Sequence, residues 1–134
     1  MGSAGVTGLD HASVIVTDPV RARAFYSGLL GLREIPMPRT FNFEVIWYDF
    51  GLQTVHLLVK DQPDTRSPRH FALKVADAKA SREYFRARKI PIQETTPIPG
   101  ADRFFINDPD GNRIELIEWQ RPYDPVADGM PPKN

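Results

Sequence analysis

The chain has 134 residues and no cysteine. Disulfides, thiolate nucleophiles and metal centres held by cysteine are therefore excluded. The formal net charge is zero, because 17 basic residues balance 17 acidic ones, so no broad attraction to nucleic acid or to an anionic membrane is expected. No apolar run approaches the roughly 20 residues that a membrane-spanning helix needs. A nucleic acid or a membrane is therefore not an expected partner.

The length suits one domain of ordinary size, which we place at residues 9–119. Residues 1–8, MGSAGVTG, lack the basic and apolar regions of a secretory signal, and we expect a flexible N-terminus there. The absence of cysteine is compatible with a cytoplasmic protein. Residues 120–134 are rich in proline and polar side chains. They predict a C-terminal tail that forms neither a helix nor a sheet interior.

Histidine is also scarce, and all three histidines take part in one repeated spacing. His11 and His70 are 59 residues apart, since 70 − 11 = 59. His56 and Glu115 are also 59 residues apart, since 115 − 56 = 59. A duplication that brings two ligand pairs around one cation would produce this spacing.

The predicted elements repeat at the same offset. The first half predicts a strand at 9–17, a helix, an extended piece at 32–36, and strands near 43–50 and 53–60. Thr17 or Asp18 caps the helix, and its apolar face contains Val20, Ala24, Phe25 and Leu29. After a polar linker at 61–68, the second half predicts a strand at 69–75, a helix capped by Asp77, an extended piece at 90–94, and a hairpin of 103–107 with 112–118. Asp49 aligns with Asp108 at the 59-residue offset. The sequence therefore predicts an α+β protein made of two tandem βαβββ modules, residues 9–60 and 69–119.

Strand alternation predicts which sheet face each candidate ligand occupies. His11 shares a face with Ser13 and Ile15, and Glu115 shares one with Arg113 and Ile117. Similar counting for His56 and His70 puts every candidate opposite the face best suited to pack under a helix. One face of the sheet would bury helices, and the other would line a cleft that holds the ligands.

Imidazole and carboxylate groups together suit a borderline divalent ion such as Fe, Ni, Co, Zn or Mn. Three neutral histidines and one glutamate would leave a net charge of about +1 on a divalent site. A six-coordinate ion would keep two positions open for water or substrate, as a catalytic metal requires. His56 could instead form a hydrogen bond within the cleft.

Two pairs of local motifs strengthen this interpretation. They are LDHASVIVTD with FYSGLLGL in the first half, and HFALKV with FFINDPDGNRIELIE in the second. DPDGNRIEL is the most specific piece, although DPDGN is also typical of a tight hairpin turn. Over residues 9–119 the chain resembles the vicinal oxygen chelate superfamily. That superfamily includes glyoxalase I, fosfomycin resistance proteins, extradiol dioxygenases, methylmalonyl-CoA epimerase and bleomycin resistance proteins.

The resemblance implies a cupped mixed sheet around a metal bound by His11, His70 and Glu115, with His56 at the remaining ligand position. Glyoxalase I typically has glutamate at that position and the epimerase glutamine, so the chain departs from both. A carboxylate there resembles the base that moves the substrate proton, and His56 is accordingly a candidate ligand or acid/base group. Members of similar size usually pair, which implies a homodimer.

The leading functional hypothesis is a metal-dependent lyase, isomerase or dioxygenase-type enzyme that chelates a small oxygen-rich substrate, with Glu115 as a ligand. Trp47, Tyr48, Arg103 and Phe104 are candidate substrate contacts, with core packing as the alternative for the aromatic residues and solvent exposure for Arg103. An Fe(II) extradiol dioxygenase and a metal-free protein that sequesters a drug or another ligand are the competing hypotheses. A fosfomycin-type thiol transferase is disfavoured, because no phosphonate-binding cluster is evident.

Overall fold

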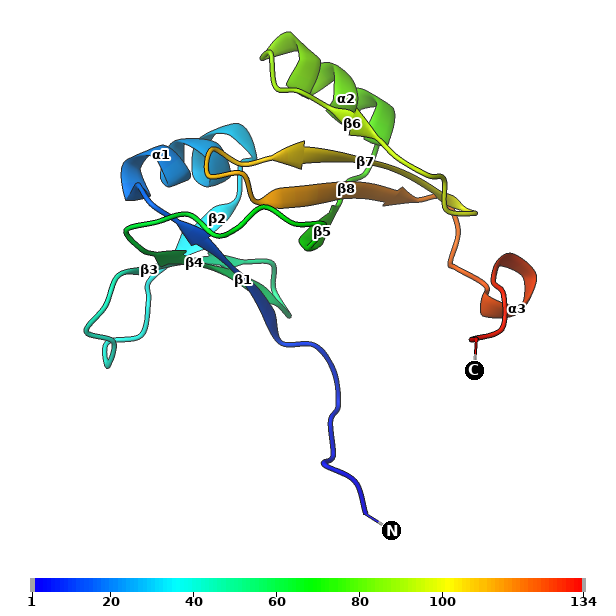
Figure 1. The fold of residues 1–134 in the computed structure, drawn as a ribbon, viewed down its shortest axis with the longest axis horizontal. Coiled ribbons are helices and arrows are strands. Elements are labelled where there is room, and N and C mark those ends of the chain that lie inside the picture. Colours follow the sequence, from blue (N-terminus) through cyan, green and yellow to red (C-terminus); the bar gives the residue numbers. More distant parts are fainter. Residues whose placement is uncertain (1, 134) are drawn as a thin grey trace. The chain divides into compact units, whose positions relative to one another are not determined.

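A computed structural model describes residues 2–133 as an α+β protein with two four-stranded mixed sheets. Its internal contacts divide the chain into two compact units (Figure 1). Unit 1 contains the residues up to 66 together with 108–112, and unit 2 contains residues 67–107 together with those from 113 onward. The boundary between residues 66 and 67 falls inside the predicted linker. The two predicted βαβββ modules are confirmed.

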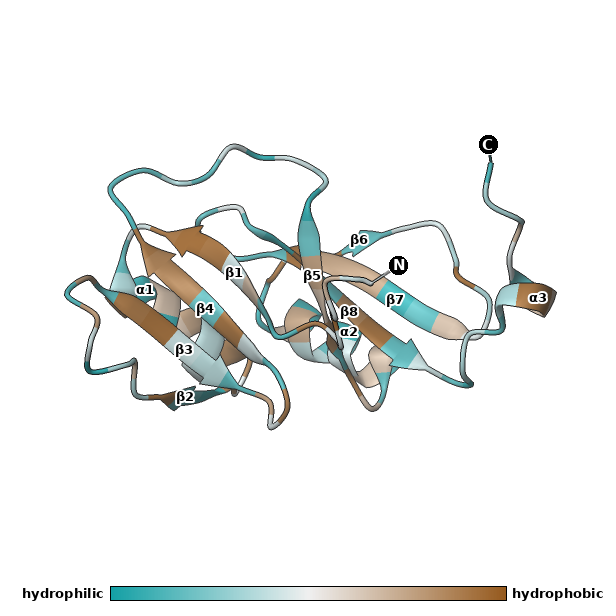
Figure 2. Ribbon diagram, turned by 90° about the horizontal axis from the view of Figure 1, so that it is seen from below, coloured by the Kyte–Doolittle hydropathy of each residue, from teal (hydrophilic) through white to brown (hydrophobic). Residues whose placement is uncertain are grey.

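Unit 1 contains the first sheet, with strand order β1-β4-β3-β2. Its elements are β1 (His11–Val16), α1 (Pro19–Arg23), the π-helix η1 (Ala24–Leu29), β2 (Arg33–Ile35), β3 (Val45–Asp49) and β4 (Thr54–Val59). β1 runs parallel to β4, and the other two pairings are antiparallel. β1 and β4 are largely hydrophobic (Figure 2), as suits strands that are packed on at least one face.

Unit 2 contains the second sheet, with strand order β5-β8-β7-β6. Its elements are β5 (His70–Lys74), α2 (Ala78–Ala87), β6 (Gln93–Glu94), β7 (Ala101–Asn107), β8 (Arg113–Trp119) and α3 (Pro125–Asp128). β5 is parallel to β8, and the remaining pairs are antiparallel. The second sheet therefore repeats the connectivity of the first.

The helix of unit 1 begins where the sequence predicts and buries part of its predicted apolar face. Asp18 caps α1 by accepting hydrogen bonds from two main-chain N–H groups. Phe25 is buried as predicted, whereas Val20 is 78% exposed and Tyr26, which was not predicted on this face, is fully buried. α1 then passes into the wider π-helical turn of η1, where Leu30 N donates to Phe25 O, five residues back.

The DPDGN segment does more than close the hairpin between β7 and β8, because residues 108–112 pack with unit 1. Tyr26 Oη donates to Asp108 Oδ2 at 2.7 Å, and Thr17 Oγ1 donates to Asp110 Oδ1 at 2.7 Å. Asn112 Nδ2 donates to the main-chain oxygen of Ile15 at 2.7 Å. Burial and the adjacent Asp108 carboxylate raise the pKa of Tyr26, so its phenol remains a donor.

The helix of unit 2 is tied to its sheet by Arg82. Its guanidinium donates to both carboxylate oxygens of Glu94 and of Asp102, and its Cζ lies 4.8 Å from the centroid of the Phe104 ring. The Arg82 side chain is only 14% exposed. Hydrogen bonds from Arg82 hold the pKa of Asp102 below its ordinary value.

We expect Arg82→Gln to lower the free energy of unfolding by about 2 kcal/mol at neutral pH, after allowance for the exposure of its partners. Because the folded-state pKa of Asp102 is depressed, its contribution is present above the unfolded pKa and is lost as the pH falls through the folded pKa. Chemical denaturation at several pH values checks this. The wild-type protein should lose stability in that acid range, and the variant should lose less there. Equal acid losses would contradict the assignment.

The C-terminal segment corrects one expectation, because it contains the short helix α3. Asp124 caps it and Pro125 takes the first helical position, where proline costs no hydrogen bond. Arg121 binds both carboxylate oxygens of Asp128, which closes this turn. Among residues 2–133, every helix is too short or too polar to cross a membrane.

Candidate functional site

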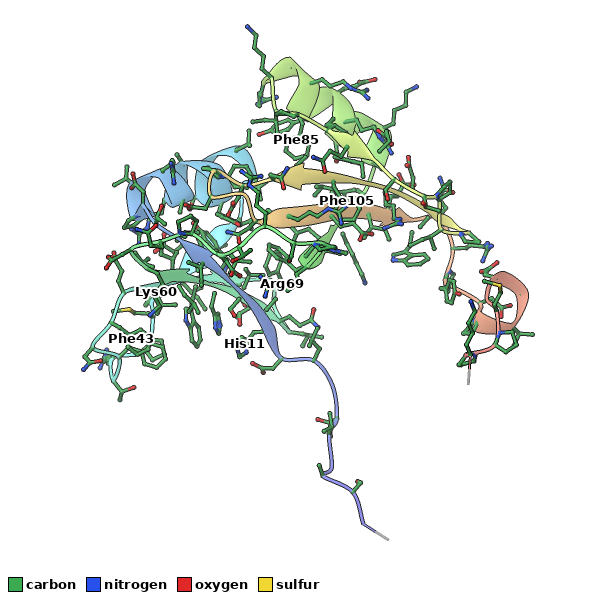
Figure 3. All side chains as sticks on the ribbon, in the orientation of Figure 1. His11, Phe43, Lys60, Arg69, Phe85 and Phe105 are labelled. Carbon is green, nitrogen blue, oxygen red and sulfur yellow. The ribbon has the colours of Figure 1, made fainter. Side chains whose placement is uncertain are left out.

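In unit 1, the candidate ligands lie on the sheet face opposite the helix. Tyr48, on the helix side, stacks against Tyr26 and hydrogen-bonds Ser27. Its neighbour on β3, Trp47, points to the other face and pairs across the ladder with His56. His11 stands at the start of β1 (Figure 3) and stacks on His56. The predicted face assignment is confirmed for this unit.

Unit 2 has the same arrangement. Phe104 faces α2, where it meets Phe85, a residue labelled on that helix in Figure 3. Phe105 points to the opposite face and pairs across the ladder with Glu115. His70 is on that face too, because its Nε2 lies 3.0 Å from Glu115 Oε1.

The two candidate pairs occupy equivalent positions in the two hydrogen-bonding ladders. His56 is paired with Ser13, two residues after His11. Glu115 is paired with Ala72, two residues after His70. The 59-residue spacing in the sequence therefore corresponds to a repeated register in three dimensions.

The imidazoles of unit 1 form a stack with Trp47. The centroids of Trp47 and His56 are 3.8 Å apart with an interplanar angle of 8°, and those of His56 and His11 are 4.2 Å apart at 23°. His56 Nε2 lies 2.8 Å from Thr54 Oγ1. Burial, together with the nearby His11, lowers the pKa of His56, which favours its neutral form.

The pair in unit 2 is held by a buried carboxylate. Glu115 is only 7% exposed at its side chain, and its Oε1 is contacted by both His70 Nε2 and Arg103 Nη1, the latter at 3.4 Å. His70 Nδ1 lies 2.9 Å from the main-chain oxygen of Pro68. Since a carbonyl and a carboxylate both accept hydrogen bonds, the His70 ring can donate to both only as an imidazolium.

This geometry fits a divalent ion at His70 and Glu115. His70 Nε2 and Glu115 Oε1, which lie 3.0 Å apart, are a nitrogen and an oxygen donor of the kinds that would hold such an ion. The Nδ1 atom of His70 faces Pro68 O, an outer contact typical of metal-binding histidines.

In unit 1, His11 shares this outer contact but the pair is not arranged for ligation. His11 Nδ1 lies 2.8 Å from Asp10 Oδ2, which leaves Nε2 for an ion. The stacked rings of His11 and His56 are close to parallel, whereas two rings bound to one ion direct their lone pairs to one point. Ligation by both would therefore require one ring to turn, and His11, with a side chain 45% exposed, has the room to do so.

Within residues 2–133, no group of three or more histidine, cysteine, aspartate or glutamate side chains is gathered to hold a metal ion. Each unit carries two of the four predicted ligands. A family model described as the Glyoxalase/Bleomycin resistance protein/Dioxygenase superfamily matches residues 8–116. The chain belongs to this superfamily.

Solved structures of other proteins share the fold of this chain. A putative glyoxalase family protein from Bacillus anthracis is 28% identical with a TM-score of 0.79, over 88% of this chain and 99% of that one. A lactoylglutathione lyase from Agrobacterium tumefaciens is 22% identical with a TM-score of 0.67, over 85% and 95% of the two chains. TnmS3, an antibiotic binding protein from Streptomyces sp. CB03234, is 17% identical with a TM-score of 0.67, over 87% and 99%. No curated protein matches the sequence.

Two of the four predicted substrate contacts, Tyr48 and Phe104, belong to the cores of their units. Tyr48 and Phe104 are fully buried on the helix-covered faces, which fits the core-packing alternative. Trp47 and Arg103 share the faces of the candidate ligands. The indole Nε1–H of Trp47 is buried and has no hydrogen-bond partner among the described residues.

Phe105, which lies directly across from Glu115, is a residue of the ligand face that was not among the predicted contacts. The register of the β7–β8 hairpin decides which of two adjacent phenylalanines faces the ligands. The DPDG turn could have indicated that register, because the length of a hairpin turn fixes the pairing of its strands.

Proposed function

We propose that this protein is a divalent-metal-dependent enzyme that chelates a small oxygen-rich substrate through two neighbouring oxygens. The observation that supports it best is the repeated register of His11 with His56 and of His70 with Glu115, each on the helix-free face of its sheet. Each pair supplies nitrogen or oxygen donors of the kinds that bind divalent ions. Membership in the superfamily supports this further.

We assign His11, His70 and Glu115 as ligands of Fe, Ni, Zn, Mn or Co. The bound ion would polarise the substrate oxygens and stabilise an enolate or alkoxide. His56 differs from the other two histidines, because its Nε2 contacts Thr54 and its ring is enclosed by Trp47 and His11. Its lowered pKa leaves a neutral ring that can accept a proton, so we assign it as a ligand or as the acid/base group.

Titration of chelator-treated protein with each of the five metals tests the proposal. Elemental analysis should find about one ion per chain. A metal concentration of 100 times the Kd should raise the free energy of unfolding by about 2.7 kcal/mol. Far less than one ion, with no rise in the melting temperature, would favour a metal-free protein that sequesters a ligand. Light scattering on the loaded and metal-free forms would show whether the protein is a homodimer.

An Fe(II) extradiol dioxygenase is the second candidate function. The contact between His56 and Thr54 favours this function, because a His56 ring that binds Thr54 is not a metal ligand. The remaining candidates, His11, His70 and Glu115, then form a two-histidine, one-carboxylate set that leaves coordination positions open for oxygen and substrate. Oxygen uptake by the Fe(II)-loaded protein with catechols distinguishes the two candidates. We expect no uptake from a lyase or isomerase, and catechol-dependent uptake would establish the dioxygenase.

A further inference from the structure

The ligand face of unit 2 carries two guanidinium groups around one aromatic ring. The Cζ of Arg113 lies 3.5 Å from the centroid of Phe105, and the Cζ of Arg103 lies 5.7 Å from it. His70 meets the same ring edge-on, at a centroid distance of 4.9 Å. Phe105 is directly opposite Glu115 in the ladder, so both guanidinium groups lie beside the candidate metal ligands.

The corresponding positions in unit 1 carry no charged side chains. The pair of guanidinium groups is therefore not a general feature of the βαβββ module. Trp47 pairs with His56 as Phe105 pairs with Glu115. Two residues before Trp47 is Val45, where unit 2 has Arg103. Two residues before His56 is Thr54, where unit 2 has Arg113. The positive charge is therefore confined to the face that carries the buried carboxylate.

The two arginines differ in what they contact. Arg103 is 15% exposed at its side chain, donates twice to Thr96 O and once to Glu115, and is therefore committed to holding the carboxylate. Arg113 has one long hydrogen bond among the described residues, to Pro68 O at 3.5 Å. A guanidinium stacked on a ring keeps its in-plane N–H groups available for another partner.

Arg103 and Arg113 lie beside one carboxylate, Glu115, so this part of the face carries an excess of positive charge. A neutral diol or dicarbonyl would leave that charge uncompensated, whereas a carboxylate matches both the charge and the planar donor pair of an arginine. A carboxylate next to a carbonyl or hydroxyl oxygen also supplies the two neighbouring oxygens of the proposed function.

We propose that Arg113 binds the carboxylate of the substrate, and that the substrate class is a 2-oxo- or 2-hydroxycarboxylate. Arg103 is a positioning residue that holds Glu115. The choice of substrate class rests on the proposed function, but the anion subsite does not, because it is formed by Arg113 stacked on Phe105.

A matched pair of probes tests this subsite. Pyruvate and methyl pyruvate have the same α-oxo group and similar size, but only pyruvate has a charged carboxylate. Calorimetric titration of both probes into metal-free and metal-titrated protein should show pyruvate binding at least roughly tenfold more tightly in each state, because a hydrogen bond to a charged group is worth about 1.5–3 kcal/mol. Equal affinities, or no measurable binding of pyruvate in either state, would overturn the proposal.

The variants separate recognition from folding. Arg113→Gln should remove the preference for pyruvate, and Arg113→Lys should restore part of it, because lysine keeps the charge without the planar fork. Arg88→Gln is the control, since Arg88 also stacks at 3.5 Å on a ring, that of Tyr84, but at the end of α2. The preference for pyruvate should be unchanged in Arg88→Gln. A preference that survives Arg113→Gln, or is lost equally in Arg88→Gln, would overturn the assignment.

The two proposals fail separately. Metal binding with no pyruvate preference would leave the proposed function in place and remove the subsite. A pyruvate preference in protein that takes up no metal would leave the subsite in place and remove the proposed function.

Discussion

Replacing Glu115 by glutamine, or His70 by alanine, is expected to reduce bound metal from about one ion per chain to a small fraction of that value. Each change removes a proposed ligand, and loss of even an outer partner of a ligand costs about 10- to 100-fold in affinity, so a larger loss is expected here. Elemental analysis after dialysis, together with the metal-induced rise in melting temperature, measures the effect.

Variants of other residues show whether the loss is specific. Glu118, also on β8, accepts a hydrogen bond from Ala78 N at the start of α2, so Glu118→Gln should bind metal normally. His11→Ala should lose the metal as Glu115→Gln does. Retention of the ion in His56→Asn would show that His56 is not a required ligand. Normal metal content in both His70→Ala and Glu115→Gln would contradict the ligand assignment.

Asp108→Ala is expected to lower the free energy of unfolding by about 3 kcal/mol, because it leaves several buried donors without an acceptor. Asp108 is 5% exposed. Its carboxylate accepts hydrogen bonds from Tyr26 Oη, from the N–H groups of Asp110 and Asn112, and from Asn112 Nδ2. Chemical denaturation measures the change, and metal binding measured in parallel shows whether the candidate ligands are still in place.

Asp49 provides a matched control for this change, because it is the residue that aligns with Asp108 in the first module. Its carboxylate contacts only the Gly51 N–H and the Arg33 side chain, among the described residues, and both contacts are exposed. Asp49→Ala should therefore cost at most about 1 kcal/mol. Similar losses in both variants would show that the buried contacts of Asp108 are not the cause.

The fold and the ligand faces could be predicted from the sequence because they depend on short-range regularities. Strand alternation fixes the side of the sheet on which each residue lies, and a duplication repeats it at a constant offset. His11, His56, His70 and Glu115 accordingly lie on the expected faces. Aspartate caps mark the starts of both main helices for the same local reason.

The features that could not be predicted depend on a change of helical geometry or on long-range packing. The π-helical turn of η1 could not be predicted, because no local pattern of apolar residues indicates such a turn. The docking of residues 108–112 on unit 1 requires Thr17, Tyr26 and Ile15, which are more than 80 positions away in the chain. Arg113 was placed on the ligand face, but its stacking on Phe105 required the register of β7 and β8.

We propose that His11, His70 and Glu115 hold one divalent ion. An anomalous-scattering map from crystals of the metal-loaded protein, with elemental analysis of the same sample, would locate that ion. We expect one peak per chain, about 2.0–2.2 Å from His70 Nε2, from a Glu115 carboxylate oxygen and from His11, and the distance from the peak to His56 would show whether His56 is a fourth ligand. No peak at His70 and Glu115, or separate ions at the two pairs, would contradict it.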